Sequence, residues 1–144
     1  LEIDPFAIAD GQDVAADALV WAADKLGQGP VLIYSSADPA DVAKVQEKLG
    51  REAAGDLVEQ TMGRIARGLV DAGVRKMVVA GGETSGAVVN ALGIRALRIG
   101  PEIDPGVPWT QTIGGTEMAL ALKSGNFGNV DFFERALTLL EKSS

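Results

Sequence analysis

The 144-residue chain contains no cysteine and no histidine. Without cysteine there are no disulfide bonds and no thiolate metal sites. Without histidine there are no Ser-His catalytic triads and no imidazole metal ligands, and the commonest general base is missing. The sequence also lacks an apolar run near the roughly 18 residues that a membrane-spanning helix needs, and no signal-peptide pattern is visible. Any site must therefore be built from other groups.

Positive charge is also scarce. Thirteen Lys and Arg residues face twenty Asp and Glu residues, which gives a net charge of −7 and a sequence pI of about 4.5. Nucleic-acid-binding proteins usually carry a basic stripe that neutralises phosphates, and none is apparent here. We therefore expect neither a nucleic acid nor a membrane as a partner. A single phosphate group is still an eligible ligand, because backbone N–H donors bind anions without carrying net charge.

The composition is that of an ordinary globular protein, and the length of the chain suits one domain. Apolar runs alternate with helical patterns over the first two thirds of the chain, which predicts an α/β fold with a mostly parallel sheet between two layers of helices, three layers in all. Because the first residues read as a strand already under way and no Met begins the chain, we expect a piece of a longer polypeptide. The predicted strands are Leu1–Ile3 (ended by Pro5), Pro30–Ser36 (buried on both faces) and Lys76–Ala80. The predicted helices are Asp10–Leu26, Pro39–Leu49 (with Asp38 as N-cap), Gly55–Asp71 and Thr84–Leu92.

The last third of the chain has a different character. Its residues alternate between apolar and polar, and prolines punctuate it, so we predict short extra strands, including Ile94–Gly100 and Thr116–Lys123. The paired glycines within Ile113–Met118 predict a hairpin turn. A final helix is predicted over Asn129–Lys142, with Asn129 as its N-cap. Its predicted inner face consists of Phe132, Phe133, Ala136, Leu137 and Leu140.

The segment "AGGETSGA" is the strongest candidate for a binding loop. It lies between a predicted buried strand and a helix, where unpaired N–H groups and a partial positive charge favour anions. Gly81 and Gly82 would let an anion approach the backbone, and Thr84 and Ser85 would add hydroxyl donors. Glu83 fits only beside Mg²⁺ or as a helix cap. The segment matches neither the Walker A nor the G-x-G-x-x-G pattern, so a turn that uses glycine for geometry alone is the competing interpretation.

A second glycine-rich segment, "LKSGNFGN", also follows a predicted strand and precedes a helix. Gly125 and Asn126 are its candidate ligand contacts, and Lys123 is the only cation at either loop. Two such loops at one edge of a sheet could hold a di- or triphosphate from two sides. A solvated lysine beside a simple turn is the alternative.

Other residues give weaker signals. Trp21 and Trp109 could stack on an adenine ring, although a role in the core or at its rim is favoured. Asp10, Asp13 and Asp17 lie at helical spacing and are best explained as a solvated acidic face. No pair of carboxylates near the glycine loops forms an obvious acid/base couple, so the catalytic residues stay unknown.

Taken together, the strand–"GGETS"–helix motif and the "ALKSGNFG" motif about forty residues later resemble the C-terminal nucleotide-binding domain of the four-carbon acid sugar kinases, which phosphorylate threonate, erythronate and 3-oxo-tetronate. The likeness covers essentially the whole chain. It is most specific between Val78 and Gly128 and includes "IGPEIDPGVPW".

This resemblance implies a cytoplasmic, ATP-dependent kinase that uses Mg²⁺, in which a separate N-terminal domain holds the sugar acid. By motif, Gly81, Gly82, Glu83 and Thr84 would line the ATP phosphates, and Gly125 would meet the nucleotide from the other side. The family's upstream Gly-Ser-x-Ser stretch and its sugar-acid domain are absent from this sequence, so we expect the fragment alone to be inactive. The alternative is a non-catalytic module that binds a small phosphorylated or carboxylated metabolite. The sequence leaves homo-oligomerisation open.

Overall fold

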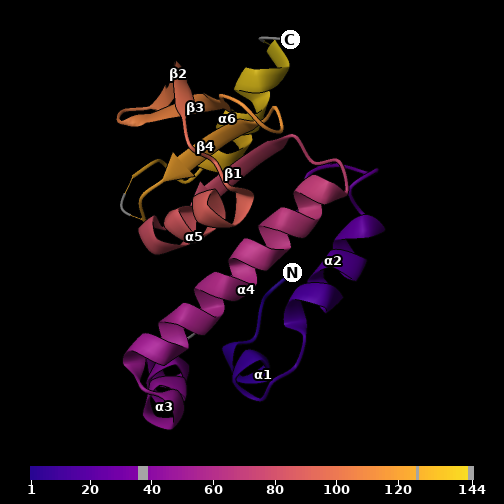
Figure 1. Cartoon of the computed structure of the whole chain (residues 1–144). Coiled ribbons are helices and arrows are strands. Elements are labelled where there is room, and N and C mark those ends of the chain that lie inside the picture. The colour runs from indigo at the N-terminus through magenta and orange to yellow at the C-terminus, as the bar shows by residue number, and fades with distance from the viewer. Residues whose placement is uncertain (36–38, 126, 143–144) are drawn as a thin grey trace. The chain divides into compact units, whose positions relative to one another are not determined.

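The computed structural model describes residues 1–35, 39–125 and 127–142, and the chain divides into two compact units, residues 1–72 and 73–144 (Figure 1). The first unit contains four helices: α1 (Pro5–Ala9), α2 (Val14–Ala23), α3 (Pro39–Leu49) and α4 (Arg51–Asp71). The second unit contains β1 (Lys76–Ala80), α5 (Gly82–Leu92), β2 (Leu97–Asp104), β3 (Val107–Thr112), β4 (Ala119–Lys123) and α6 (Phe132–Lys142). Among the described residues, no helix combines the length and apolar character needed to cross a membrane.

In the first unit, α4 contacts each of the other three helices, and Figure 1 shows α2 running beside it. Small residues of α2 allow this approach, because Ala15 and Ala18 are buried against Ile65. Ile3 and Ile8 complete the same apolar cluster. This unit is therefore held together mainly by the burial of apolar side chains between helices.

Helix α1 was not predicted from the sequence. Pro5 was expected to end a strand, but it begins the helix, and the Asp4 side chain caps that helix by accepting from Phe6 N at 2.8 Å. Proline is favoured at the first helical position, because the N–H that it lacks would have no partner there. The same Asp-Pro pattern correctly predicted the start of α3 at Pro39, although Asp38, its expected cap, lies outside the described residues.

Three predicted helix boundaries are wrong by several residues. Helix α2 begins at Val14 rather than at Asp10, because Asp13 supplies the cap, accepting from Ala16 N. It also ends at Ala23, before the predicted Leu26. Helix α4 begins four residues earlier than predicted, at Arg51, after Gly50 as N-cap. Its end at Asp71 is confirmed.

The predicted buried strand at Pro30–Ser36 is also wrong over the residues that the structure describes. The segment forms one isolated parallel bridge, between Tyr34 and Glu2, and does not join the four-stranded sheet. Leu32 is 54% exposed, whereas Ile33 packs on the apolar cluster of the first unit. The segment therefore buries only one of its sides. Ser36, its predicted last residue, lies outside the described part.

The second unit is built on one sheet with the strand order β1-β4-β3-β2. Strands β1 and β4 are parallel, and the other two neighbouring pairs are antiparallel. The α/β class and the extra strands in the C-terminal half are confirmed, but the expectation of a mostly parallel sheet is wrong. The reason is that the strands predicted in the first unit do not join this sheet, so the late hairpins supply three of its four strands.

The main core of the second unit lies between the sheet and α6. Trp109 and Ala121 are register partners in β3 and β4, and they pack against Phe132 and Ala136 of the helix. Because side chains alternate along a strand, Leu120 points to the opposite face, where it is fully buried. Helix α5 contacts β1 and β4. The sheet is thus buried on both sides near its central strands.

The turn predicted within Ile113–Met118 is confirmed. It joins the antiparallel strands β3 and β4, and both of its glycines have positive φ. The final helix differs more from expectation. It begins at Phe132 rather than just after Asn129, and Phe133, expected on its inner face, is 40% exposed.

Candidate functional site

The two glycine-rich segments lie at one edge of the sheet. Since β1 and β4 are adjacent and parallel, their carboxyl ends lie side by side, with Ala80 opposite Lys123 in the last register pair. One further main-chain hydrogen bond joins the strand ends, from Gly81 N to Lys123 O at 2.8 Å. We define glycine loop 1 as residues 81–85 and glycine loop 2 as residues 124–128. Both loops therefore begin within one residue of this bond, at the strand edge where α/β sheets bind ligands.

Glycine loop 1 turns directly from β1 into α5. Gly81 is the N-cap residue and has φ +115° and ψ 131°, a conformation that favours glycine. No side chain caps this helix end, and the first intrahelical bond runs from Ser85 N to Gly81 O at 2.9 Å. The first-turn N–H groups ahead of Ser85 lack intrahelical acceptors, as in any α-helix. They form a local donor cluster that suits an anion.

Two hydroxyl groups stand within this loop. The Oγ1 atom of Thr84 lies close to Gly81, since a Cβ atom added to that glycine would be 3.2 Å from it. The Oγ atom of Ser85 is buried and has no hydrogen-bond partner within the described structure. A buried hydroxyl without a partner is costly, and a bound ligand would relieve that cost.

Glu83 is exposed and, within the described part of the chain, forms no hydrogen bond or ion pair. A capping role is not seen, because the Gly81 N–H donates to the end of β4 instead. Glu83 lies in the first turn of α5, where the helix dipole stabilises a carboxylate. Gly82 is equally open, with nothing within 4 Å of an added Cβ atom.

Glycine loop 2 is shaped by its own backbone and by α6. Phe127 N donates to Ser124 O at 3.1 Å. Gly128 has φ +87°, and an added Cβ atom would lie 2.8 Å from the Phe132 ring, so only glycine fits. Gly125 has open space around it, as a residue facing a ligand requires. Asn126, the other predicted contact in this loop, lies outside the described residues.

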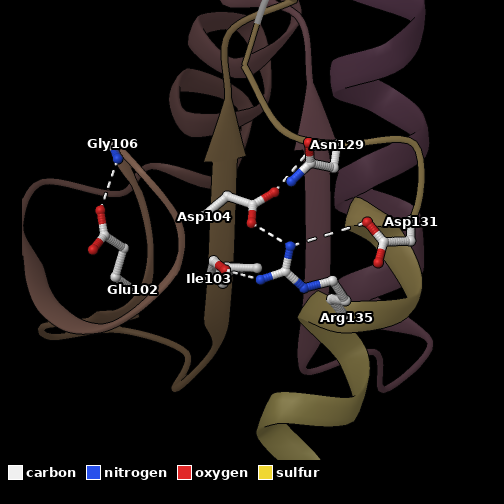
Figure 2. Close-up of polar contacts among 7 residues, drawn as sticks. All are labelled: Glu102, Ile103, Asp104, Gly106, Asn129, Asp131 and Arg135. Carbon is white, nitrogen blue, oxygen red and sulfur yellow. Dashed lines mark hydrogen bonds and ion pairs between the residues drawn. The ribbon is translucent and has the colours of Figure 1, made fainter.

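The exit of glycine loop 2 is held by a buried carboxylate that sequence reasoning missed. Asp104, at the end of β2, is 4% exposed. Figure 2 shows its two oxygens engaged: Oδ2 accepts from Asn129 N at 3.1 Å, and Oδ1 pairs with the guanidinium of Arg135. Arg135 also donates to Ile103 O at 3.0 Å. Asp104 therefore ties the residue after loop 2, and α6, to the sheet.

The turn between β2 and β3 contacts the same loop through Phe127. Gly106 N donates to the Glu102 carboxylate at 2.8 Å (Figure 2), which closes the turn. The ring of Phe127 rests on Gly106, since an added Cβ atom there would be 3.2 Å from the ring. The only hint in the sequence was the "IDPG" segment, where an aspartate ends a strand just before a Pro-Gly turn.

The remaining candidates have structural roles. Trp109 is 2% exposed, and its indole N–H donates to Ala136 O at 2.8 Å, which confirms the favoured core assignment. Trp21 is half-buried, with the Lys25 ammonium 5.2 Å from its ring centroid. Two of the three aspartates of the predicted acidic face pair with cations: Asp10 with Lys48, and Asp13 with Arg64. No group of three or more acidic side chains suited to a metal ion occurs among the described residues.

Comparison with solved structures supports the fold. The chain superimposes with a TM-score of 0.88 on a Haemophilus influenzae protein of a domain family of unknown function, with 33% identity over 96% of this chain and 34% of that one. Among curated proteins, it is 59% identical to the 3-oxo-tetronate kinase of Burkholderia multivorans over 96% of this chain. It is also 59% identical to the 3-oxo-tetronate kinase of Pseudomonas fluorescens over 94% of this chain.

These matches cover most of this chain but only part of each kinase. The chain spans about a third of each kinase, 32% and 31% of their lengths. Residues 1–133 match the family described as "Nucleotide-binding C-terminal domain". This match covers both glycine loops and the Asp104 anchor. The predicted resemblance is thereby confirmed, and the chain belongs to the family of nucleotide-binding C-terminal domains found in 3-oxo-tetronate kinases.

Proposed function

We propose that residues 1–144 form the ATP-binding part of a kinase that phosphorylates a four-carbon sugar acid. The observation that carries this proposal is the placement of two glycine loops at adjacent carboxyl ends of parallel strands, joined by the bond from Gly81 N to Lys123 O. The substrate class comes from the relatives, which are 3-oxo-tetronate kinases. We propose that the sugar acid binds to a part of the enzyme outside this sequence.

In this proposal, glycine loop 1 receives the phosphates. The first-turn N–H groups of α5 and the Thr84 and Ser85 hydroxyls donate to phosphate oxygens, and the unpartnered Ser85 Oγ gains an acceptor. Gly125 approaches from loop 2, where open space surrounds it. Phosphoryl transfer depends mainly on such positioning and on charge neutralisation, so a site without histidine or cysteine is suited to it.

The donor set also fits Mg²⁺. This ion is usually held by one or two carboxylates together with substrate phosphates and water, and not by an all-protein cage. Glu83, exposed within glycine loop 1 and without a described partner, is the residue that would hold it. When bound, Mg²⁺ would offset phosphate charge during transfer.

Calorimetric titration of the chain with Mg-ADP tests the proposal. We expect saturable binding, weakened by the absence of the rest of the enzyme. No heat and no thermal stabilisation at millimolar Mg-ADP would contradict nucleotide binding.

A non-catalytic module that binds a small phosphorylated or carboxylated metabolite is the second candidate, favoured because the described residues near the loops include no recognisable acid/base couple. Joining the chain to the N-terminal region of a relative separates the two candidates. Production of ADP that depends on 3-oxo-tetronate would exclude the non-catalytic module, and nucleotide binding without turnover would favour it.

A further inference from the structure

Lys123 directly precedes glycine loop 2 and is joined through its main chain to glycine loop 1, yet the site described above gives its charge no part. It is the last residue of β4, and it pairs in register with the last residue of β1. Its carbonyl oxygen accepts the hydrogen bond from Gly81 N, and Ser124 follows it in the chain. The main chain of Lys123 therefore belongs to the junction of the two loops.

The side chain of Lys123 is held under glycine loop 2. A Cβ atom added to Gly128 would be 3.1 Å from its Cε atom, so the alkyl chain passes close to that glycine. The ammonium lies 5.9 Å from the centroid of the Phe132 ring. These contacts place the charge beside the loop and restrict the conformations open to a long side chain, which lowers the entropic cost of using it in binding.

Within the described part of the chain, the ammonium contacts carbonyl groups and no anion. Its hydrogen bonds run to two neutral carbonyls, Ser124 O at 3.2 Å and Gly125 O at 3.3 Å. Among the described residues, no carboxylate forms an ion pair with it. A phosphate oxygen would offer a charge-assisted bond of about 2.7–2.9 Å, shorter and stronger than either carbonyl contact.

We infer that Lys123 is a phosphate-binding residue of the two-loop site and supplies the positive charge that a Walker lysine supplies elsewhere. This inference rests on the proposed nucleotide-binding function. The ammonium leaves the carbonyls of Ser124 and Gly125 and binds a phosphate oxygen of the nucleotide. The neutral donors of glycine loop 1 orient the phosphates, and Lys123 makes the site selective for a ligand with several negative charges.

The test compares ADP with adenosine, since only the first carries phosphates. Lys123→Met should weaken the binding of Mg-ADP about tenfold and leave adenosine affinity unchanged, whereas Lys123→Arg should retain most of the ADP affinity. Lys76→Met is the matched control, because it removes the same charge from the exposed first residue of β1, at the far end of the strand. An equal loss for ADP and adenosine, or no loss for either, would overturn the inference.

A second measurement does not depend on the folding of any variant. In the wild-type chain, Mg-ADP should slow the acetylation of Lys123 several-fold, adenosine should not, and Lys76 should react equally in both cases, as followed by mass spectrometry. Equal acetylation of Lys123 with and without bound ADP would overturn the inference but leave nucleotide binding intact. A wild-type chain that does not bind ADP would instead contradict the proposed function and, with it, the inference.

Discussion

The carboxylate of Asp104 and the guanidinium of Arg135 join the end of β2 to α6 across 31 residues of sequence. The pair is asymmetric, because the aspartate side chain is 3% exposed and the arginine side chain is 44% exposed. Asp104 also accepts from Asn129 N, the first residue after glycine loop 2. The buried member of the pair thus fixes the exit of a candidate ligand loop.

Replacing Asp104 should therefore lower the stability of the second unit. We expect Asp104→Asn to lower the free energy of unfolding by about 1–3 kcal/mol, since it removes a charge-assisted bond and leaves Arg135 without its buried partner. Urea denaturation measures this loss. Glu102→Gln is a suitable control, because its carboxylate bonds an exposed turn amide, and it should cost much less. Equal stabilities of the two variants would contradict the role assigned to Asp104.

Gly82→Val tests glycine loop 1. Nothing lies within 4 Å of an added Cβ atom at Gly82, so the unit should stay folded while the new side chain blocks the approach of phosphate to the first-turn N–H groups. We expect loss of Mg-ADP binding in calorimetry, with a melting temperature near that of the wild type.

Gly86→Val provides the matched control for this change, because Gly86 lies in the same helix and is equally open. It should bind Mg-ADP normally. If Gly82→Val unfolds the unit, the interpretation of loop 1 as a simple turn gains support; if it binds normally, the assignment of the loop is wrong.

Two alanine substitutions in glycine loop 2 should differ clearly in their effect on stability. Gly128→Ala should cost about 1–3 kcal/mol, because it strains a positive φ and pushes a Cβ atom into the Phe132 ring. Gly125→Ala meets nothing within 4 Å at an ordinary φ and should be neutral or slightly stabilising. Urea denaturation of the two variants measures the contrast, and similar values would show that loop 2 is not packed on α6 as described.

Trp109→Phe tests whether Trp109 stabilises the core or contacts the ligand. The change removes the hydrogen bond to Ala136 O and should lower the free energy of unfolding by about 1–2 kcal/mol. Mg-ADP affinity should be unchanged, because the indole is buried in the core between the sheet and α6. A large fall in affinity at unchanged stability would instead indicate that Trp109 contacts the nucleotide.

Local patterns in the sequence predicted most of the second unit. The strand at Lys76–Ala80, the helix ending at Gly93 and the glycine turn before β4 are all specified by residues near one another in the chain. The same reasoning failed at Pro30–Ser36, because an apolar run does not reveal whether partner strands exist on both sides of it. Sheet order was inaccessible for a similar reason, since the pairing of β1 with β4 passes over two intervening strands.

For the candidate site, sequence reasoning proposed the two loops but not their supports. Glycines between a strand and a helix are recognisable locally, and the structure confirms that both segments leave adjacent strand ends. Asp104 and its partners were missed because their contacts span 25 and 31 residues. Whether the loops bind nucleotide stays a prediction that the experiments above address.

The bond from Gly81 N to Lys123 O has a consequence for amide hydrogen exchange. It continues the ladder between β1 and β4 by one rung, so the Gly81 amide can exchange with solvent only when the sheet separates at that edge. Its exchange rate should therefore follow the opening of the whole unit, although Gly81 is the first residue of a loop. The separation of the two strand ends from which the loops leave is accordingly set by a main-chain hydrogen bond, which does not involve the side chain of Lys123.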